Sequence, residues 1–142
     1  YKYQYDEVDN LRFFTDARQK VTTYTYDNLN RQITVKNPLN QTVTLGYDAV
    51  GNTTSVTDAL NLRTQYQYDA LNRQIKVIDA RNGIVELTYD KASNLLSLKD
   101  PVNNLTLYEY DALNRLITET NPLNLIRRYE YDPVGNLTKL TN

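Results

Sequence analysis

The sequence predicts an all-β protein built from short antiparallel hairpins. Three observations support this fold class: a dipeptide that recurs at fixed spacing, strands whose apolar residues alternate, and two turn signatures in every repeat. A fixed internal period determines the whole architecture of a repeat protein. No segment shows the apolar stripe of an amphipathic helix.

The repeat is marked by the dipeptide Tyr-Asp, which recurs every 21 residues without insertion or deletion. Its seven copies are the predicted structural motif: Tyr5, Asp6, Tyr26, Asp27, Tyr47, Asp48, Tyr68, Asp69, Tyr89, Asp90, Tyr110, Asp111, Tyr131 and Asp132. Because the spacing holds along the whole sequence, we expect residues 1–142 to form one array of about seven repeats, as a piece of a longer repeat protein.

Each repeat contains two predicted turns. In the first, as in residues 48–51, Asp opens the turn and Gly or Asn usually ends it. Gly and Asn tolerate a positive φ, and an Asp side chain can hydrogen-bond the backbone two residues ahead. The second turn, as in residues 37–40, has Asn or Asp first and often Pro second, which is typical of a type I turn.

The strands between the turns have a period of two. Apolar residues alternate in residues 32–36, and Tyr24 and Tyr26 are two positions apart with Thr25 between them. Side chains alternate across a strand, so one face of the sheet should be aromatic and apolar and the other polar. We also expect the rings of Tyr66, Tyr68, Tyr108 and Tyr110 to stack and so hold neighbouring hairpins together, with Gln67 facing solvent.

Two features of the repeat remain open from the sequence. If the second Tyr pairs with the Arg or Asn that follows the turn, the Tyr face aligns with Ile33, Ile75 and Ile117, whereas a one-residue bulge would swap the faces. A weaker period of 42 residues places Arg31, Arg73 and Arg115 after alternate turns, with Asn after the others. This period indicates either duplication of a two-repeat unit or packing of the hairpins in pairs.

Residues 128–137, Arg-Tyr-Glu-Tyr-Asp-Pro-Val-Gly-Asn-Leu, resemble the Tyr-x-Tyr-Asp-x-x-Gly-Arg-Leu core of the YD-repeat (Rhs) family. Residues 66–73 are similar, with Asn in the Gly position. The resemblance covers the whole chain. It implies long antiparallel sheets that spiral into a hollow shell, in bacterial polymorphic toxins, in insecticidal toxin complexes that enclose a toxic cargo, and in teneurin-type adhesion proteins. The cleavage-associated region that follows the repeats in cargo-bearing members has no match here.

The expected architecture is therefore a curved antiparallel β-sheet spiral that forms a shell wall. Open sheets of more than about ten strands tend to curl, which also favours curvature. A β-solenoid of stacked parallel coils is the alternative, because a strict period without insertions suits it. The first and last strands, residues 1–5 and 137–140, look like ordinary repeat strands. We expect them to pair with further repeats of the same polypeptide or with other copies.

Composition excludes several functions. His and Cys are absent, which removes the commonest general base and all thiolate chemistry, so we expect no enzyme, cofactor or metal site. A net charge of −1 argues against nucleic-acid binding, and no apolar run reaches the roughly 20 residues of a membrane span.

The predicted function is a structural segment of a secreted or cell-surface protein, as part of a shell around a toxin or other cargo polypeptide. The alternative is a segment of an extracellular fibre or adhesin that contacts glycans, cells or its own copies.

Overall fold

The computed structural model describes all 142 residues and contains strands and turns only. The strands are β1 (Lys2–Tyr5), β2 (Leu11–Thr15), β3 (Val21–Tyr26), β4 (Gln32–Lys36), β5 (Thr42–Tyr47), β6 (Thr53–Thr57), β7 (Arg63–Tyr68), β8 (Gln74–Ile78), β9 (Ile84–Tyr89), β10 (Leu95–Lys99), β11 (Leu105–Tyr110), β12 (Leu116–Thr120), β13 (Ile126–Tyr131) and β14 (Leu137–Thr141).

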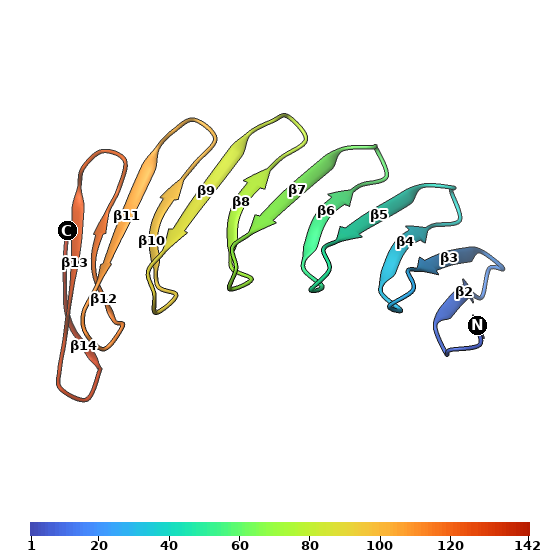
Figure 1. Cartoon of the computed structure of the whole chain (residues 1–142), viewed down its shortest axis with the longest axis horizontal. Coiled ribbons are helices and arrows are strands. Elements are labelled where there is room, and N and C mark those ends of the chain that lie inside the picture. The colour runs from blue at the N-terminus through green and yellow to red at the C-terminus, as the bar shows by residue number, and fades with distance from the viewer. The chain divides into compact units, whose positions relative to one another are not determined.

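The strands form one antiparallel sheet whose strand order is the order in the sequence (Figure 1). The all-β antiparallel prediction is confirmed, and the alternative of a solenoid with parallel coils is wrong. The reason lies in the two tight turns of each repeat, since a connection this short can join only antiparallel neighbours. The structure has no helix that could cross a membrane.

The contacts divide the chain into two units, Tyr1–Tyr66 and Gln67–Asn142. Each unit is a single layer of hairpins, and no residue of either is fully buried. A sheet normally buries one face against a second layer, and neither unit contains such a layer. The apolar side chains therefore contact only their neighbours along the sheet.

All thirteen turns share one hydrogen-bond pattern. In residues 27–30, the N–H of Asn30 donates to the Asp27 carbonyl at 3.0 Å, and the N–H of Asp27 donates to the Arg31 carbonyl at 2.9 Å. The Asp27 carboxylate accepts the N–H groups of Leu29 and Arg31. The last turn residue has a positive φ, which is 59° at Asn30. Both predicted turn signatures are confirmed, and the second also ends in a left-handed residue.

The register across the Tyr-Asp turn contains a bulge. Tyr26 pairs with Gln32 rather than with Arg31, and the register then shifts by one residue, so that Thr25 pairs with Thr34. The later start of pairing and the bulge each shift the alignment by one residue in the same direction, and a total shift of two residues leaves each side chain on its original face. Tyr24 therefore pairs with Val35. Of the two alignments left open, the Tyr face thus shares its side of the sheet with the column of Ile33. The bulge is present but does not swap the faces, because pairing also starts one residue later.

The two faces of the sheet differ as expected. We call the face that bears the tyrosine columns the apolar face. On it Tyr24 pairs with Val35, Val35 with Val43, and Leu45 with Val56 in the first unit. Val77 pairs with Val85, and Leu87 with Leu98, in the second unit. The opposite face is more polar, with a hydroxyl contact of 2.6 Å between Thr25 and Thr34 and an ion pair of 3.8 Å between Lys76 and Glu86.

Candidate functional site

The edge of the sheet that holds the Tyr-Asp turns, which we call the Tyr-Asp edge, is joined by side chains. We use hairpin for two strands joined by a Tyr-Asp turn. Neighbouring hairpins pair their backbones at only three positions, beside the turn that connects them. Between β2 and β3, the pair farthest from that turn is Phe13 with Thr23. Towards the Tyr-Asp edge the ladder stops. There the hydroxyl of Tyr26 donates to the Leu11 carbonyl at 2.9 Å. Equivalent bonds of 2.9 Å run from Tyr47 to Gln32, Tyr89 to Gln74 and Tyr131 to Leu116.

This bond gives the Tyr of the motif a clear structural role. It lies at the end of a long strand and bonds a backbone carbonyl 15 residues earlier, in the preceding hairpin. Partial burial raises the pKa of Tyr26, so its hydroxyl keeps the proton that it donates. At these four positions the motif tyrosine thus closes the part of the sheet that the backbone ladder leaves open.

Arginines after alternate turns connect hairpins a second time. Arg31 pairs with the Asp27 carboxylate of its own turn at 2.7 Å and donates to the Asp48 carbonyl of the next turn at 2.8 Å. Its guanidinium lies over the Tyr47 ring, 4.7 Å from the centroid. The same three contacts recur for Arg73 with Asp69, Asp90 and Tyr89, and for Arg115 with Asp111, Asp132 and Tyr131.

The remaining turns use asparagine and make a weaker link. The Asn10 amide donates to the Asp6 carboxylate and to the Asn30 side chain of the next hairpin, at 3.1 and 3.0 Å. Asn94 does the same with Asp90 and Asn114. We call the contact between neighbouring hairpins at the Tyr-Asp edge a junction. Junctions held by an arginine, which we call clamped, thus alternate with junctions bridged by two side-chain amides. The 42-residue period has a structural counterpart, which supports the interpretation that the hairpins pack in pairs.

The expected stacking of tyrosine rings is not found. The aromatic ring contacts within the units are those of Tyr1 and Tyr3 with Phe14, at 6.0 and 5.2 Å between centroids. Tyr66, Tyr108 and Tyr110 make none. A strand without tyrosine separates successive tyrosine strands, so their rings are about 9.6 Å apart, two strand spacings. Guanidinium groups cover the rings of Tyr47, Tyr89 and Tyr131 instead. Gln67 is exposed, as predicted.

The motif aspartates are held apart, each in its own turn. Hydrogen bonds from the side chain and then the backbone of Arg73 lower the pKa of Asp69, and a side-chain hydrogen bond from Asn52 leads the same shift at Asp48. These carboxylates therefore stay ionised and are occupied as acceptors. No three His, Cys, Asp or Glu residues come together as a metal site.

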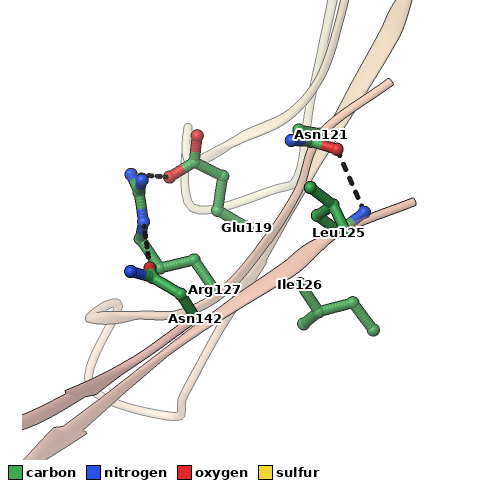
Figure 2. A pocket seen from close by; sticks show the side chains of 6 residues that line it. All are labelled: Glu119, Asn121, Leu125, Ile126, Arg127 and Asn142. Carbon is green, nitrogen blue, oxygen red and sulfur yellow. Dashed lines mark hydrogen bonds and ion pairs between the residues drawn. The ribbon is translucent and has the colours of Figure 1, made fainter. Parts of the chain in front are cut away.

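A cluster of polar side chains interrupts the apolar face in the second unit, beside a hollow of about 270 Å³ (Figure 2). Glu119 pairs with Arg127 across β12 and β13 at 3.4 Å and accepts the Tyr129 hydroxyl at 2.9 Å. Arg127 also donates to Asn142 at 3.0 Å. The sequence interpretation missed this cluster, although its signal is visible: the positions 21 residues apart in this column are otherwise Phe14, Val35, Val56, Val77, Leu98 and Leu140.

Sequence comparison identifies the repeat. The profile of the family described as RHS Repeat matches residues 5–42, 47–84, 89–126 and 110–142. The chain belongs to the Rhs repeat family. The first three matches begin 42 residues apart, so each spans two Tyr-Asp turns. The fourth match begins 21 residues after the third, which is one Tyr-Asp repeat.

Solved structures show the same fold. The Rhs-repeat chain is similar to crystal structures of TcdB2-TccC3-Cdc42 and of TcdB2-TccC3 without its hypervariable C-terminal region, and to a Tc holotoxin pore from Photorhabdus luminescens. Each likeness has a TM-score of 0.76 and 20% sequence identity, over 97% of this chain. The chain spans only 9% of the length of those chains. No curated protein matches the sequence.

Proposed function

We propose that this Rhs-repeat segment is a non-enzymatic part of a shell wall, in a secreted protein, whose apolar face lies against an enclosed polypeptide. The observation that carries the proposal is the single-layer sheet with one apolar face that nothing in the chain covers. Uncovered apolar sheet surface of this kind is typical of an interface. The family resemblance indicates which kind of molecule would cover this face, because the cargo-bearing members of the family enclose a polypeptide.

The side chains support a non-enzymatic role. General acid catalysis by a carboxyl group needs a raised pKa, whereas hydrogen bonds hold the pKa values of Asp27, Asp69 and Asp111 below the usual range. The arginines that face these groups are occupied in bonds between hairpins. The polar groups of the Tyr-Asp edge therefore serve the sheet itself.

Exposed apolar turn residues support packing against further repeats of the same polypeptide. Along the Tyr-Asp edge, one turn position is a largely exposed Val or Leu, with exposed fractions from 61% to 83%: Val8, Leu29, Val50, Leu71, Leu113 and Val134. The other edge has Leu39, Leu60, Val102 and Leu123, each more than 70% exposed. A row of apolar tips along both edges fits contact with an adjacent coil of the same shell.

The alternative function, a segment of an extracellular fibre or adhesin, has one specific observation in its favour. Tyr1, Tyr3 and Tyr5 lie on one strand face and are 81%, 55% and 58% exposed. Exposed aromatic faces with a polar tip are suited to contact with sugars. This alternative predicts glycan binding or self-association by the segment, with no protected polypeptide.

Limited proteolysis of the full-length polypeptide tests the two functions. A shell predicts that a domain encoded beyond the repeats resists protease while the repeats are intact. Val56→Lys on the apolar face should release that protection, whereas the matched change Thr44→Lys on the opposite face should retain it. Digestion of the downstream region at the rate of the free domain would overturn the proposal, and saturable glycan binding would favour the adhesin.

A further inference from the structure

Arg12 is out of place in the repeat pattern. It lies in β2 on the apolar face, two positions before Phe14, whose ring contacts Tyr1 and Tyr3 on β1. The equivalent positions at 21-residue intervals are Ile33, Thr54, Ile75, Leu96, Ile117 and Thr138, none of which is charged. In the strands of the first unit, Arg12 is the one charged residue on this face.

The guanidinium of Arg12 has no partner. Its Nε atom is buried without a hydrogen bond, and the side chain makes no ion pair. The arginines of the Tyr-Asp edge are all paired, as is Arg127. The other arginines that lack a side-chain partner are exposed to water: Arg18, Arg63, Arg81 and Arg128. A partly buried cation without a partner is costly, so a group that pairs with it would bind favourably.

One carboxylate that Arg12 acts on is already a hydrogen-bond acceptor. Asp6 is close enough for the charge of Arg12 to act on its pKa, yet its oxygens accept the N–H groups of Val8 and Asn10 and the Asn10 amide. The charge of Arg12 also acts on the Tyr26 hydroxyl, which is neutral and donates its proton to the Leu11 carbonyl. Asp6 therefore offers Arg12 a charge at a distance but no ion pair, and the buried Nε–H of Arg12 stays without an acceptor.

We propose that Arg12 is a docking site for the carboxylate of an Asp or Glu side chain on an extended polypeptide that lies along the apolar face. A guanidinium binds a carboxylate through two parallel hydrogen bonds, and the surrounding apolar side chains suit the residues that flank it. Nucleic acid would require a row of cations, which this face does not have. The inference rests on the proposed function and adds to it the chemistry that the enclosed chain must present at this position.

The test compares two blocked peptides, Val-Glu-Val and Val-Gln-Val, in titrations of the whole chain followed by the Nε–Hε resonance of Arg12. The glutamate peptide should move this resonance saturably and bind about tenfold more tightly than the glutamine peptide. Arg12→Leu should abolish the preference and still fold, because Leu96 occupies the equivalent position. Arg12→Lys should retain only part of it. Arg18→Leu, at an exposed arginine, should leave it unchanged.

Equal affinity for the two peptides would overturn the docking site but leave the apolar face as a polypeptide-binding surface, so the proposed function would survive. A preference that persists in Arg12→Leu would also overturn it, since the carboxylate would then bind elsewhere. Acetate at the peptide concentration serves as the final control. If acetate reproduced the shift of the resonance, the site would take any free anion, and the inference would be wrong.

Discussion

Tyr and Asp of the repeat motif act on different parts of the backbone. The Asp carboxylate accepts N–H groups inside its own turn, whereas the Tyr hydroxyl reaches a carbonyl of the preceding hairpin. One residue therefore shapes the turn and the other joins neighbouring hairpins. This division of roles explains why the two residues recur together at a fixed spacing.

The Tyr role predicts the effect of removing one hydroxyl. Tyr47→Phe keeps the ring beneath Arg31 but deletes the 2.9 Å bond to the Gln32 carbonyl. The free energy of local opening between β4 and β5 should fall by about 0.5–1.5 kcal/mol. Amide hydrogen exchange measures this change. Tyr24→Phe is the matched control, since that hydroxyl has no hydrogen-bond partner, and an equal loss of protection in both variants would contradict the assigned role.

The Asp role predicts acid sensitivity. A hydrogen bond from the Arg115 backbone leads the effects on Asp111, and its pKa lies below the usual 3.8. Because the folded-state pKa is depressed, the stabilisation is present above about pH 4, the range of an unfolded Asp. It is lost as the pH falls through the folded-state value. The protection factors of the Leu113 and Arg115 amides, which donate to Asp111, should therefore fall in acid, after the intrinsic exchange rate at each pH is divided out.

Asp111→Asn provides the control for this acid sensitivity. Asn37 shows that an Asn side chain accepts the same two N–H groups, at 2.9 and 3.0 Å. The variant should therefore keep the turn, lose the ion pair with Arg115, and show protection factors at this turn that do not change between pH 6 and about pH 3. A variant as acid-sensitive as the parent would show that the titrating group lies elsewhere.

At the scale of the element, the hairpin depends on a turn and a bulge that act together. The turn places Tyr26 opposite Gln32, and the bulge returns Val35 to the face of Tyr24. Without the bulge, the strand after each turn would present its polar residues to the apolar face. The same register shift occurs next to the Tyr of the Tyr-Asp motif in the hairpins that begin with β1, β3, β5, β9, β11 and β13, with the extra residue on the strand that follows the turn.

The left-handed turn residue gives a prediction at this scale. Asn124 ends the turn of residues 121–124 with a φ of 59°. Asn124→Val should lower the free energy of unfolding by about 1–2 kcal/mol, because a β-branched side chain is strained there, whereas Asn124→Gly should be tolerated. Leu123→Ser, at a neighbour that is 77% exposed, is the control. Thermal unfolding of the three variants measures the difference, and equal midpoints for Val and Gly would contradict the explanation.

At the scale of the whole molecule, repeats of one length make junctions of two kinds. The Arg31 junction has an ion pair, a bond to the next turn and a guanidinium over Tyr47, whereas the Asn10 junction has only amide contacts. In a repeat protein, stability is close to a sum of nearest-neighbour terms. The array should therefore open first at the junctions bridged by asparagine.

This alternation predicts the result of changing one arginine. Arg31→Asn should convert a clamped junction to the asparagine kind, since Asn52 already caps Asp48 in that way. Amide protection between β4 and β5 should fall to the level between β2 and β3, with little change at distant hairpins. Arg63→Asn, at an exposed arginine, is the control. Loss of protection along the whole chain would contradict the nearest-neighbour description.

The sequence by itself determined the repeat, the positions of the turns and the two faces of the sheet. These follow from local rules: Asp or Asn opens a turn, Gly or Asn ends it, and side chains alternate along a strand. The regular spacing of Tyr26 and Tyr47 also indicated the repeating hairpin, and with it the antiparallel fold.

Only the tertiary structure decided the contacts between hairpins. The bulge, the bond from Tyr26 to Leu11 and the position of Arg31 over Tyr47 depend on how far neighbouring strands diverge at the Tyr-Asp edge. The sequence shows that each of these residues recurs once per repeat or once per pair of repeats. It does not show which residue of the neighbouring hairpin each one contacts. The expected ring stacking failed for the same reason, because the intervening strand sets a distance that only the folded sheet reveals.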